Sequence, residues 1–296
     1  MNASKGTYQL IATDLDGTLL DSQGRVTPAV AEAVRQATAA GIELIIASGR
    51  NRPAVEPVLE ELGLRTPHIG TGGAYIAHPD GRIPFYQPVP AAYIPEIVAL
   101  ARRFGLGMGF FEVDATYLEG PPDWVEWMLE HYSSPGTLVV ADMLAAGIGL
   151  PGKIFWWGDL PPLLEAVKTL EECNLPLTLV KSLENGYEIN AAGVTKGRAL
   201  QAYAAMKGIP PEKVVAFGDQ HNDLSMFAVA GLSVAMGNAP AAVQAAARQV
   251  VPSNDQSGLA WGIYNLVLNG RHRPFSPAGG DLSARQEIDR RLSRGE

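Results

Sequence analysis

The sequence predicts an α/β protein: a parallel sheet with helices on its faces, interrupted by an inserted α+β domain. In residues 1–84 and 190–272, short apolar runs alternate with helical patterns, which is typical of βαβ units. Residues 85–189 break this alternation, hold four of the five tryptophans and are punctuated by prolines. The 296 residues are enough for about two domains. Residues 273–296 are charged and broken by Gly and Pro, so we expect a mobile tail.

The helices and strands of the first segment are predicted from the residues that begin and end them. An apolar run at 8–13 stops at two aspartates, as a buried strand does. Thr27 and Pro28 open a helix that runs to residue 40, and Gly41 ends it. The run at 42–47 predicts a second strand, and a helix is expected at 53–62, before Gly63.

The insert and the last segment are interpreted in the same way. In the insert we expect helices at 95–104 and 161–173, and strands at 153–157, 177–181 and 186–190. In the last segment we expect helices at 195–206, 222–230 and 240–249, alternating with strands at 213–217 and 232–236.

Composition excludes several classes of function. Lys+Arg 23 against Asp+Glu 31 gives a net charge of −8, which argues against nucleic acid as a general partner. No apolar run reaches the ~18 residues of a membrane helix, and no signal-peptide core follows Met1, so no membrane association is expected. The single cysteine, Cys173, cannot form an internal disulfide and suits a reducing cytoplasm. With so few Cys and His, any metal is expected to bind oxygen.

The most informative motif is Asp14-Leu15-Asp16-Gly17-Thr18-Leu19, at the end of the first predicted strand. Open parallel sheets bind ligands at the carboxyl ends of their strands, so both carboxylates should face that crevice. Two aspartates this close repel each other unless a cation or a proton separates their charges. A simple strand exit through an Asp-Gly turn is the alternative interpretation.

Three further motifs occupy comparable positions. Ser48-Gly49-Arg50 follows the second strand and offers a hydroxyl and open backbone N–H groups to an anion. Lys196 falls in the first turn of a helix, where its charge calls for an anion nearby. Gly218-Asp219-Gln220-His221-Asn222-Asp223 adds carboxylates that suit a hard cation such as Mg²⁺. Each motif alone has another interpretation: the first fits a Ser-Gly loop, Lys196 fits a surface lysine, and the third fits a capped turn.

Together and in this order, the four motifs resemble those of the haloacid dehalogenase-like (HAD) hydrolase superfamily. DLDGTL, ASGR, GVTKG and GDQHND stand at residues 14–19, 47–50, 193–197 and 218–223. The long insert between the second and third motifs is similar to that of the Cof-type, or IIB, branch. The resemblance covers about residues 8–269. It implies a Rossmann-like parallel-sheet core with an inserted αββ-type (C2B-type) cap domain that closes over the site.

The resemblance also implies a chemistry, which is Mg²⁺-dependent hydrolysis of phosphate monoesters through an aspartyl-phosphate. Asp14 would be the nucleophile, and Asp16 the general acid and then the general base. Asp14, the backbone carbonyl of Asp16 and Asp219 would hold Mg²⁺. Ser48 and Lys196 would bind the phosphoryl oxygens, with Asn222 beside them or near the metal. Asp223 would orient Lys196 or a metal-bound water.

Two residues depart from the pattern of the branch. Gly72 stands where the branch usually has Asn, which removes an amide near the substrate. His221 is bulkier than is usual there, and we interpret it as a capping residue rather than a ligand. In the cap, Glu119, Trp156, Trp157, Lys181 and Glu184 are candidates for reading the leaving group, without an assigned role. For the Trp pair we expect one core and one surface residue, and for 124–128 helix packing.

The expected function is therefore a cytoplasmic phosphatase for small phosphorylated metabolites, either sugar phosphates or phosphorylated cofactors, as a monomer or weak homo-oligomer. A phosphatase specific for one phosphosugar (the sucrose-, mannosylglycerate- or trehalose-phosphate type) is the alternative within the same class. A phosphomutase fits less well, and the retained Asp14 and Asp16 argue against a non-catalytic protein that only binds phosphometabolites. A dinucleotide-dependent oxidoreductase would need a Gly-rich turn after the first strand, and a cap of this size would exclude a folded protein substrate.

Overall fold

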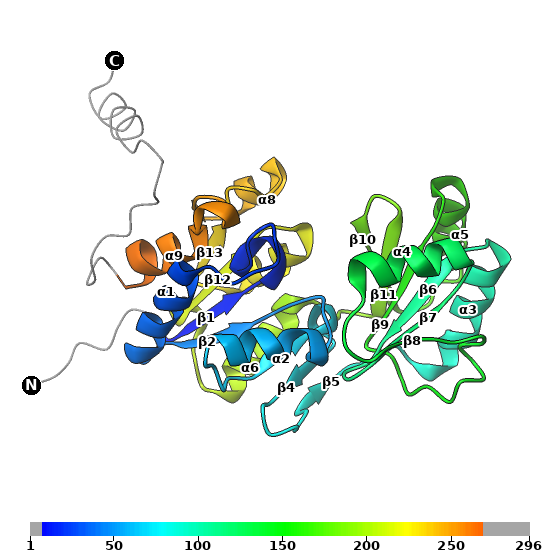
Figure 1. Ribbon diagram of the computed structural model, residues 1–296, viewed down its shortest axis with the longest axis horizontal. Coiled ribbons are helices and arrows are strands. Elements are labelled where there is room, and N and C mark those ends of the chain that lie inside the picture. The colour runs from blue at the N-terminus through cyan, green and yellow to red at the C-terminus, as the bar shows by residue number, and fades with distance from the viewer. Residues whose placement is uncertain (1–7, 269–296) are drawn as a thin grey trace, which may run out of the picture.

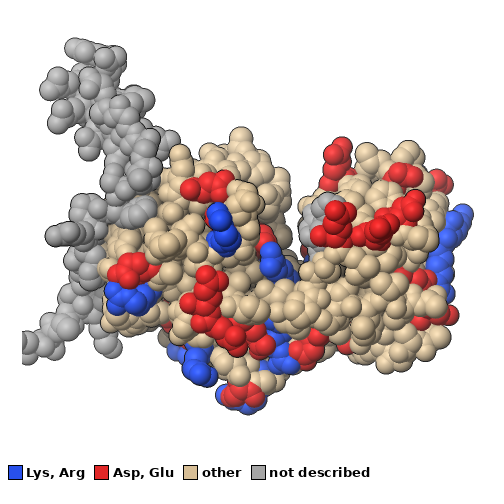
Figure 2. Space-filling view, viewed as in Figure 1, with Lys and Arg blue, Asp and Glu red and all other residues tan. Residues whose placement is uncertain are grey.

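The computed structural model describes residues 8–268, so the tail predicted at 273–296 lies outside the described residues. Two α/β lobes lie side by side in Figure 1, one around β1, β2, β12 and β13 and the other around β6–β11. The space-filling view shows the surface hollowed between them (Figure 2). The predicted α/β class with an inserted cap is confirmed.

The core lobe is built on a parallel sheet of five strands in the order β14-β13-β12-β1-β2. Their bounds are β1 Leu10–Thr13, β2 Glu43–Ile46, β12 Val214–Gly218, β13 Leu232–Ala235 and β14 Gln249–Val250. Alternate residues of β1, β2, β12 and β13 enter different apolar clusters: in β1, Ile11 joins one face, and Leu10 and Ala12 join the other. Both faces of the sheet are therefore buried, which explains why these strands read as continuous apolar runs.

Helices cover both faces of this sheet. On one face lie α1 (Pro28–Ala39), α2 (Arg52–Glu61) and α9 (Gly258–Gly262), and on the other α6 (Lys196–Met206), α7 (Leu224–Val229) and α8 (Ala241–Ala246). The predicted starts of α1 and α6 are confirmed by their caps, since Thr27 Oγ1 accepts from Val30 N at 3.3 Å and Thr195 Oγ1 from Arg198 N at 3.1 Å. Short helical turns complete the lobe at Leu15–Leu19, Thr71–Gly73, Pro211–Lys213, His221–Asp223, Asn254–Gln256 and Ile263–Val267.

The helix predicted at 240–249 is wrong in its last three residues. α8 ends at Ala246, and Gln249–Val250 form β14, which pairs with β13. The Arg248 N–H donates to the carbonyl of Ser233 at 3.1 Å, which starts this ladder. Pairing at the open edge of the sheet thus overrides the local helical pattern.

A small antiparallel sheet leads from the core to the second lobe. It contains β3 (His68–Gly70), β4 (Tyr75–Ala77) and β5 (Phe85–Tyr86), and β3 touches β2 through a parallel bridge between Ala47 and Ile69. Residues 85 and 86, which the sequence interpretation assigns to the insert, pair with β4. The domain boundaries at 84 and 189 otherwise stay predictions.

The second lobe, which we call the cap, has a six-stranded sheet in the order β10-β11-β9-β6-β7-β8. The strands are β6 Gly107–Phe111, β7 Thr116–Glu119, β8 Thr137–Val139, β9 Lys153–Trp157, β10 Leu177–Leu183 and β11 Gly186–Ala191. All neighbours are antiparallel except β7 and β8. The short turn Ala91–Tyr93 leads into α3 (Ile94–Arg103), which packs with α5 (Leu160–Glu172) on one face, while α4 (Pro122–Tyr132) packs on the other.

This arrangement corrects the expectation for the tryptophan pair. Trp156 and Trp157 are both fully buried, although they point to opposite faces of β9. Trp156 packs in the cluster of α3 and α5, whereas Trp157 packs against α4 and donates from Nε1 to the carbonyl of Trp124 at 3.0 Å. A strand covered by helices on both sides has no exposed face, so neither ring reaches solvent. The packing role expected for 124–128 is confirmed.

Within residues 8–268, no helix combines the length and the apolar composition needed to cross a membrane.

Candidate active site

Two neighbouring strands place the first two carboxylates of the site. β1 and β12 are parallel partners, with Thr13 opposite Phe217, so their carboxyl ends meet at one edge of the sheet. Asp14 follows β1 and its N–H donates to the carbonyl of Phe217 at 3.0 Å, while Asp219 follows β12. Both side chains are buried. The structure therefore brings together two of the residues that the family resemblance places around a metal.

Lys196 reaches these carboxylates from the first turn of α6. Its Nζ lies 2.6 Å from Asp14 Oδ1 and 2.7 Å from Asp223 Oδ1, and its side chain is 2% exposed. The helix can approach this closely because its next residue is Gly197: a Cβ there would lie 2.0 Å from the carbonyl oxygen of Ser225. Burial acts to lower the pKa of Lys196, but the two carboxylates outweigh it and raise that pKa above its usual value. Lys196 is therefore a buried, charged ammonium.

Asp223 and Asp219 are held in place by further hydrogen bonds. Asp223 Oδ2 accepts from the backbone N–H groups of Asp219 and Gln220, both at 2.9 Å, which closes the turn after β12. Asp219 accepts from Thr18 Oγ1 at 3.0 Å on one oxygen and from Gln220 Nε2 at 3.2 Å on the other. The loop that carries Asp14 and the loop that carries Asp219 are thus fixed to each other.

Asp14, Asp219 and Asp223 form a cluster of acidic groups that can hold a cation. One carboxylate oxygen from each lies within 4.8 Å of the others. Burial raises the pKa of Asp14 and of Asp219, and the neighbouring carboxylates raise them further, while Lys196 works in the opposite direction. A cation would relieve this cost of burying like charges, and an all-oxygen donor set fits a hard divalent ion.

Gly17 shows how closely the loops pack around this cluster. Its φ of +75° lies in the left-handed region, and a Cβ would lie 2.5 Å from Asp219 Oδ2. A side chain at this position would displace the carboxylate. Asn238, which follows β13, donates from Nδ2 to the carbonyl of Gly17 at 2.9 Å and supports the same turn.

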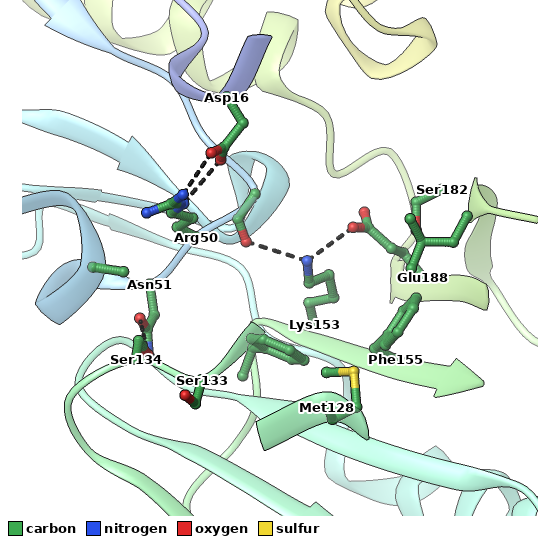
Figure 3. A pocket seen from close by; sticks show the side chains of 14 residues that line it. Asp16, Arg50, Asn51, Met128, Ser133, Ser134, Lys153, Phe155, Ser182 and Glu188 are labelled. Atoms are coloured by element: carbon green, nitrogen blue, oxygen red, sulfur yellow. Dashed lines mark hydrogen bonds and ion pairs between the residues drawn. The ribbon is translucent and has the colours of Figure 1, made fainter. Parts of the chain in front are cut away.

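Asp16 does not join the acidic cluster. Its side chain is 55% exposed and forms a bidentate ion pair with Arg50, with Nε–Oδ2 and Nη2–Oδ1 distances of 2.8 and 2.5 Å (Figure 3). Its backbone occupies the loop at Leu15–Leu19, immediately after Asp14. The structure therefore separates the two aspartates of the first motif: one is buried beside Lys196, and the other faces the space between the lobes.

Ser48 and Asn222 lie at the same edge of the sheet. Ser48 follows β2, is buried, and accepts on Oγ from the Arg50 N–H at 3.1 Å. Asn222 precedes Asp223, and its buried Oδ1 has no hydrogen-bond donor among the described residues. An unpartnered buried oxygen next to the acidic cluster is consistent with a ligand there. His221 is exposed, and the capping box of this turn is formed by Gln220 and Asp223, so the capping role interpreted for His221 is wrong.

A cavity of about 440 Å³ lies between the lobes, and of the site residues predicted from the sequence Asp16 is the one that lines it. Asp16 and Arg50 contribute from the core, and Lys153 and Glu188 face them from the cap (Figure 3). Its walls also include Gly49, Asn51, Ala54, Phe111, Met128, Ser133, Ser134, Phe155, Ser182 and Leu183. The volume is that of a pocket for a small molecule.

Sequence reasoning missed several of these residues. Thr18 and Asn238 have ordinary turn-forming side chains, and nothing in their local pattern marks them. Lys153 and Glu188 do carry a signal, because each is the one charged residue of a largely apolar strand. Of the cap candidates, Glu119 is bound by Arg102 at 2.7 Å, and Lys181 and Glu184 do not line the cavity.

Comparisons with known proteins agree with this geometry. The family model of the haloacid dehalogenase-like hydrolases matches residues 11–263. Phosphatase YwpJ of Bacillus subtilis is 30% identical over 88% of this chain and 100% of its own, and pyridoxal phosphate phosphatase YbhA of Escherichia coli is 31% identical over the same shares. The crystal structure of a haloacid dehalogenase-like hydrolase from Bacteroides thetaiotaomicron covers 88% of this chain and 99% of its own, with a TM-score of 0.81 at 26% identity.

The family match spans most of the chain, and both named relatives align over nearly their whole length. The buried aspartate after β1, the lysine of α6 and the acidic turn after β12 stand in the order that the sequence motifs predict. We conclude that the chain belongs to the haloacid dehalogenase-like hydrolases and is a phosphoric monoester hydrolase of their Cof-type branch.

Proposed function

We propose that this protein is a Mg²⁺-dependent phosphatase that hydrolyses small phosphorylated metabolites through an aspartyl-phosphate on Asp14. The observation that carries the proposal is the position of Asp14: buried at the end of β1, 2.6 Å from the Lys196 ammonium and within the acidic cluster. The Lys196 ammonium opposes the effect of burial on this carboxylate and orients it, and a bound cation would further favour the ionised form that a nucleophile needs.

The residues of the chain supply the steps of the reaction. A carboxylate oxygen of Asp14 attacks phosphorus while the bond to the leaving alcohol breaks, and Asp16 donates a proton to the departing oxygen. Water then attacks the phosphorus of the acyl phosphate and gives its proton to Asp16, which releases phosphate and restores Asp14. The exposure of Asp16 and its place on the cavity wall fit this exchange of protons.

Asp14, Asp219 and the backbone carbonyl of Asp16 are the groups that would hold Mg²⁺. Bound Mg²⁺ would offset the repulsion between the anionic nucleophile and the anionic phosphate. Asp223 fits a positioning role better than a direct ligand role, because Lys196 and two backbone N–H groups already occupy its oxygens. Ser48, Lys196 and Asn222 would bind the phosphoryl oxygens.

The cavity supports a small substrate. Its 440 Å³ would accept the alcohol part of a sugar phosphate or a phosphorylated cofactor and no folded protein. One relative, the enzyme of E. coli, is named for pyridoxal phosphate. A cytoplasmic location and a monomer or weak homo-oligomer remain predictions. The prediction of a cytoplasmic location rests on the single cysteine.

The test is phosphate release from a panel of phosphorylated metabolites, with and without Mg²⁺. We expect metal-dependent turnover by the wild type and its loss in Asp14→Asn. Asp80→Asn is the matched control, because Asp80 is exposed and pairs with Arg82. After acid quenching, mass spectrometry should find phosphate on the peptide that contains Asp14. An Asp14→Asn variant that retains turnover would refute the nucleophile, and a folded wild type inert on every ester would favour a protein that only binds phosphometabolites.

A further inference from the structure

Three neighbouring strands of the cap present a charged pair to the cavity. Lys153 on β9 and Glu188 on β11 are almost fully buried, and Lys153 Nζ lies 2.9 Å from Glu188 Oε1. Phe111 on β6 stands directly opposite Lys153, and its ring lies 4.7 Å from the ammonium. Phe155 stands opposite Glu188. Figure 3 shows Lys153, Phe155 and Glu188 together on the cap side of the cavity.

This pair also touches the core. Lys153 Nζ donates to the carbonyl of Gly49 at 3.2 Å, within the loop that carries Ser48 and Arg50. Arg50 in turn holds Asp16 on the opposite wall of the cavity. A phosphate ester whose phosphoryl group lies at Asp14 and whose leaving oxygen lies at Asp16 would extend its alcohol toward Lys153 and Glu188.

Glycines on the core leave space beside the pair. A Cβ on Gly72 would lie 3.8 Å from Glu188 Oε2, and a Cβ on Gly49 would lie 3.7 Å from Lys153 Nζ. Among the described residues, Lys153 is the hydrogen-bond donor to Glu188, and it uses Oε1. Oε2 is therefore left as an acceptor at the side of Gly72.

Stability alone does not explain why an ion pair is buried at this position. Well-packed apolar residues of the same volume are often neutral or stabilising in its place, because burial removes the solvation of both charges. The pair faces a cavity, retains an available acceptor and is flanked by two aromatic rings. These are the features of a polar anchor in a small-molecule pocket.

We infer that Lys153 and Glu188 are specificity-determining residues that recognise hydroxyl groups on the alcohol part of the substrate; this inference rests on the proposed phosphatase function. A substrate hydroxyl donates to Glu188 Oε2, the Lys153 ammonium donates to a neighbouring hydroxyl oxygen, and Phe111 and Phe155 contact the carbon skeleton. The pair thus selects esters of polyhydroxy alcohols over esters without hydroxyl groups.

The experiment compares kcat/KM for two probes, a hexose 6-phosphate and phenyl phosphate, with Mg²⁺ present. We expect the wild type to favour the hexose ester. Glu188→Gln should lower the ratio of the two kcat/KM values by about tenfold or more, mainly through KM of the hexose ester, because a charged hydrogen-bond acceptor is replaced by a neutral amide. Glu172→Gln is the matched control, since Glu172 forms an exposed ion pair with Lys168 on α5 and should leave the ratio unchanged.

A second variant keeps the test valid if Glu188→Gln destabilises the cap. Gly72 has a φ of +71°, which asparagine tolerates better than most residues. In Gly72→Asn the side-chain amide can donate to Glu188 Oε2 without removing the partner of Lys153, and we expect the same fall in the ratio.

The inference is overturned if both variants change the two esters equally, or if the wild type prefers phenyl phosphate. In either case phosphate release continues, and the proposed function stands. A wild type that releases phosphate from neither probe nor from the wider panel overturns the proposed function, and this inference with it.

Discussion

Replacing Lys196 by methionine tests how strongly the buried carboxylates depend on a cation. The ammonium is within 2.7 Å of both Asp14 and Asp223, and the side chain is 2% exposed. Methionine keeps much of the volume and removes the charge. Breaking a buried ion pair by removing one partner costs about 3–5 kcal/mol, because the other charge stays buried without compensation. We expect Lys196→Met to lose about 3 kcal/mol of unfolding free energy at pH 8 without metal.

The loss should shrink as the pH falls. Burial raises the pKa of Asp14 in the folded state above its value in the unfolded chain, and without Lys196 this pKa rises further. The folded state therefore binds this proton more tightly than the unfolded chain does. Such a group contributes stability at low pH that is lost as the pH rises through its folded-state pKa. Lys196→Met should consequently lie closer to the wild type at pH 6 than at pH 8.

The assay is urea unfolding followed by circular dichroism, at both pH values and with and without Mg²⁺. Mg²⁺ at a fixed concentration of about 100 times its Kd for the wild type would add about 2.7 kcal/mol to the stability of the wild type. We expect tighter Mg²⁺ binding, and so a larger gain, in Lys196→Met, because its carboxylates no longer share the ammonium. A variant as stable as the wild type without metal at pH 8 would refute this reasoning.

Lys207→Met is the matched control for this experiment. Lys207 also pairs with a carboxylate, Glu43, at 3.3 Å, but both side chains are partly exposed. Exposed pairs contribute about 0–1 kcal/mol. The control should therefore unfold within about 1 kcal/mol of the wild type and show no altered response to Mg²⁺.

Three further predictions concern residues around the site. Asp16→Asn should lower kcat about 10²–10⁴-fold, as loss of a general acid does. The free energy of unfolding should change by less than about 1 kcal/mol, because the ion pair of Asp16 is exposed. A variant that loses stability together with activity would contradict this. Burial lowers the pKa of His68 to about 4. The unfolding free energy should therefore be highest above pH 6.5, the pKa of an unfolded histidine, and lower by about 2 kcal/mol at pH 5. His68→Phe should abolish this loss, as measured by urea unfolding. Gly17→Ala should weaken metal-dependent phosphate release, because the new Cβ would clash with Asp219. Gly24→Ala is the control and should keep this activity, because Gly24 has a similar φ and a Cβ there would have no atom within 4 Å. Equal activity in both variants would count against the close packing at Gly17.

The sequence predicted the core of the site because strand ends are its framework. Asp14, Ser48 and Asp219 each follow an apolar run, and in a parallel sheet the carboxyl ends of such runs meet at one edge. Lys196 was found through its place in the first turn of a capped helix. Local patterns sufficed here because each residue depends on the strand or helix next to it.

The rest of the structure depends on contacts between distant segments. The local sequence does not predict that Trp156 and Trp157 are both buried, because this needs a helix on each face of β9. It also does not predict the strand at Gln249–Val250, because this needs the open edge of the sheet beside β13. The side chain of Asp16 turns to Arg50, 34 residues away, instead of joining its neighbour Asp14. Sequence spacing shows that two carboxylates are near in the chain and leaves open which way each one points.

The separation of Asp14 from Asp16 has a chemical consequence. As the proposed nucleophile Asp14 must be ionised, and it lies beside a buried ammonium in a cluster that favours a cation. A proton carrier must exchange with solvent and with the leaving oxygen, and Asp16 is half-exposed on the cavity wall. The same wall leads through Arg50 and the carbonyl of Gly49 to Lys153. An alcohol bound at Lys153 and Glu188 would therefore lie with its leaving oxygen toward Asp16, so that recognition by the cap and proton transfer in the core act on one molecule from opposite sides.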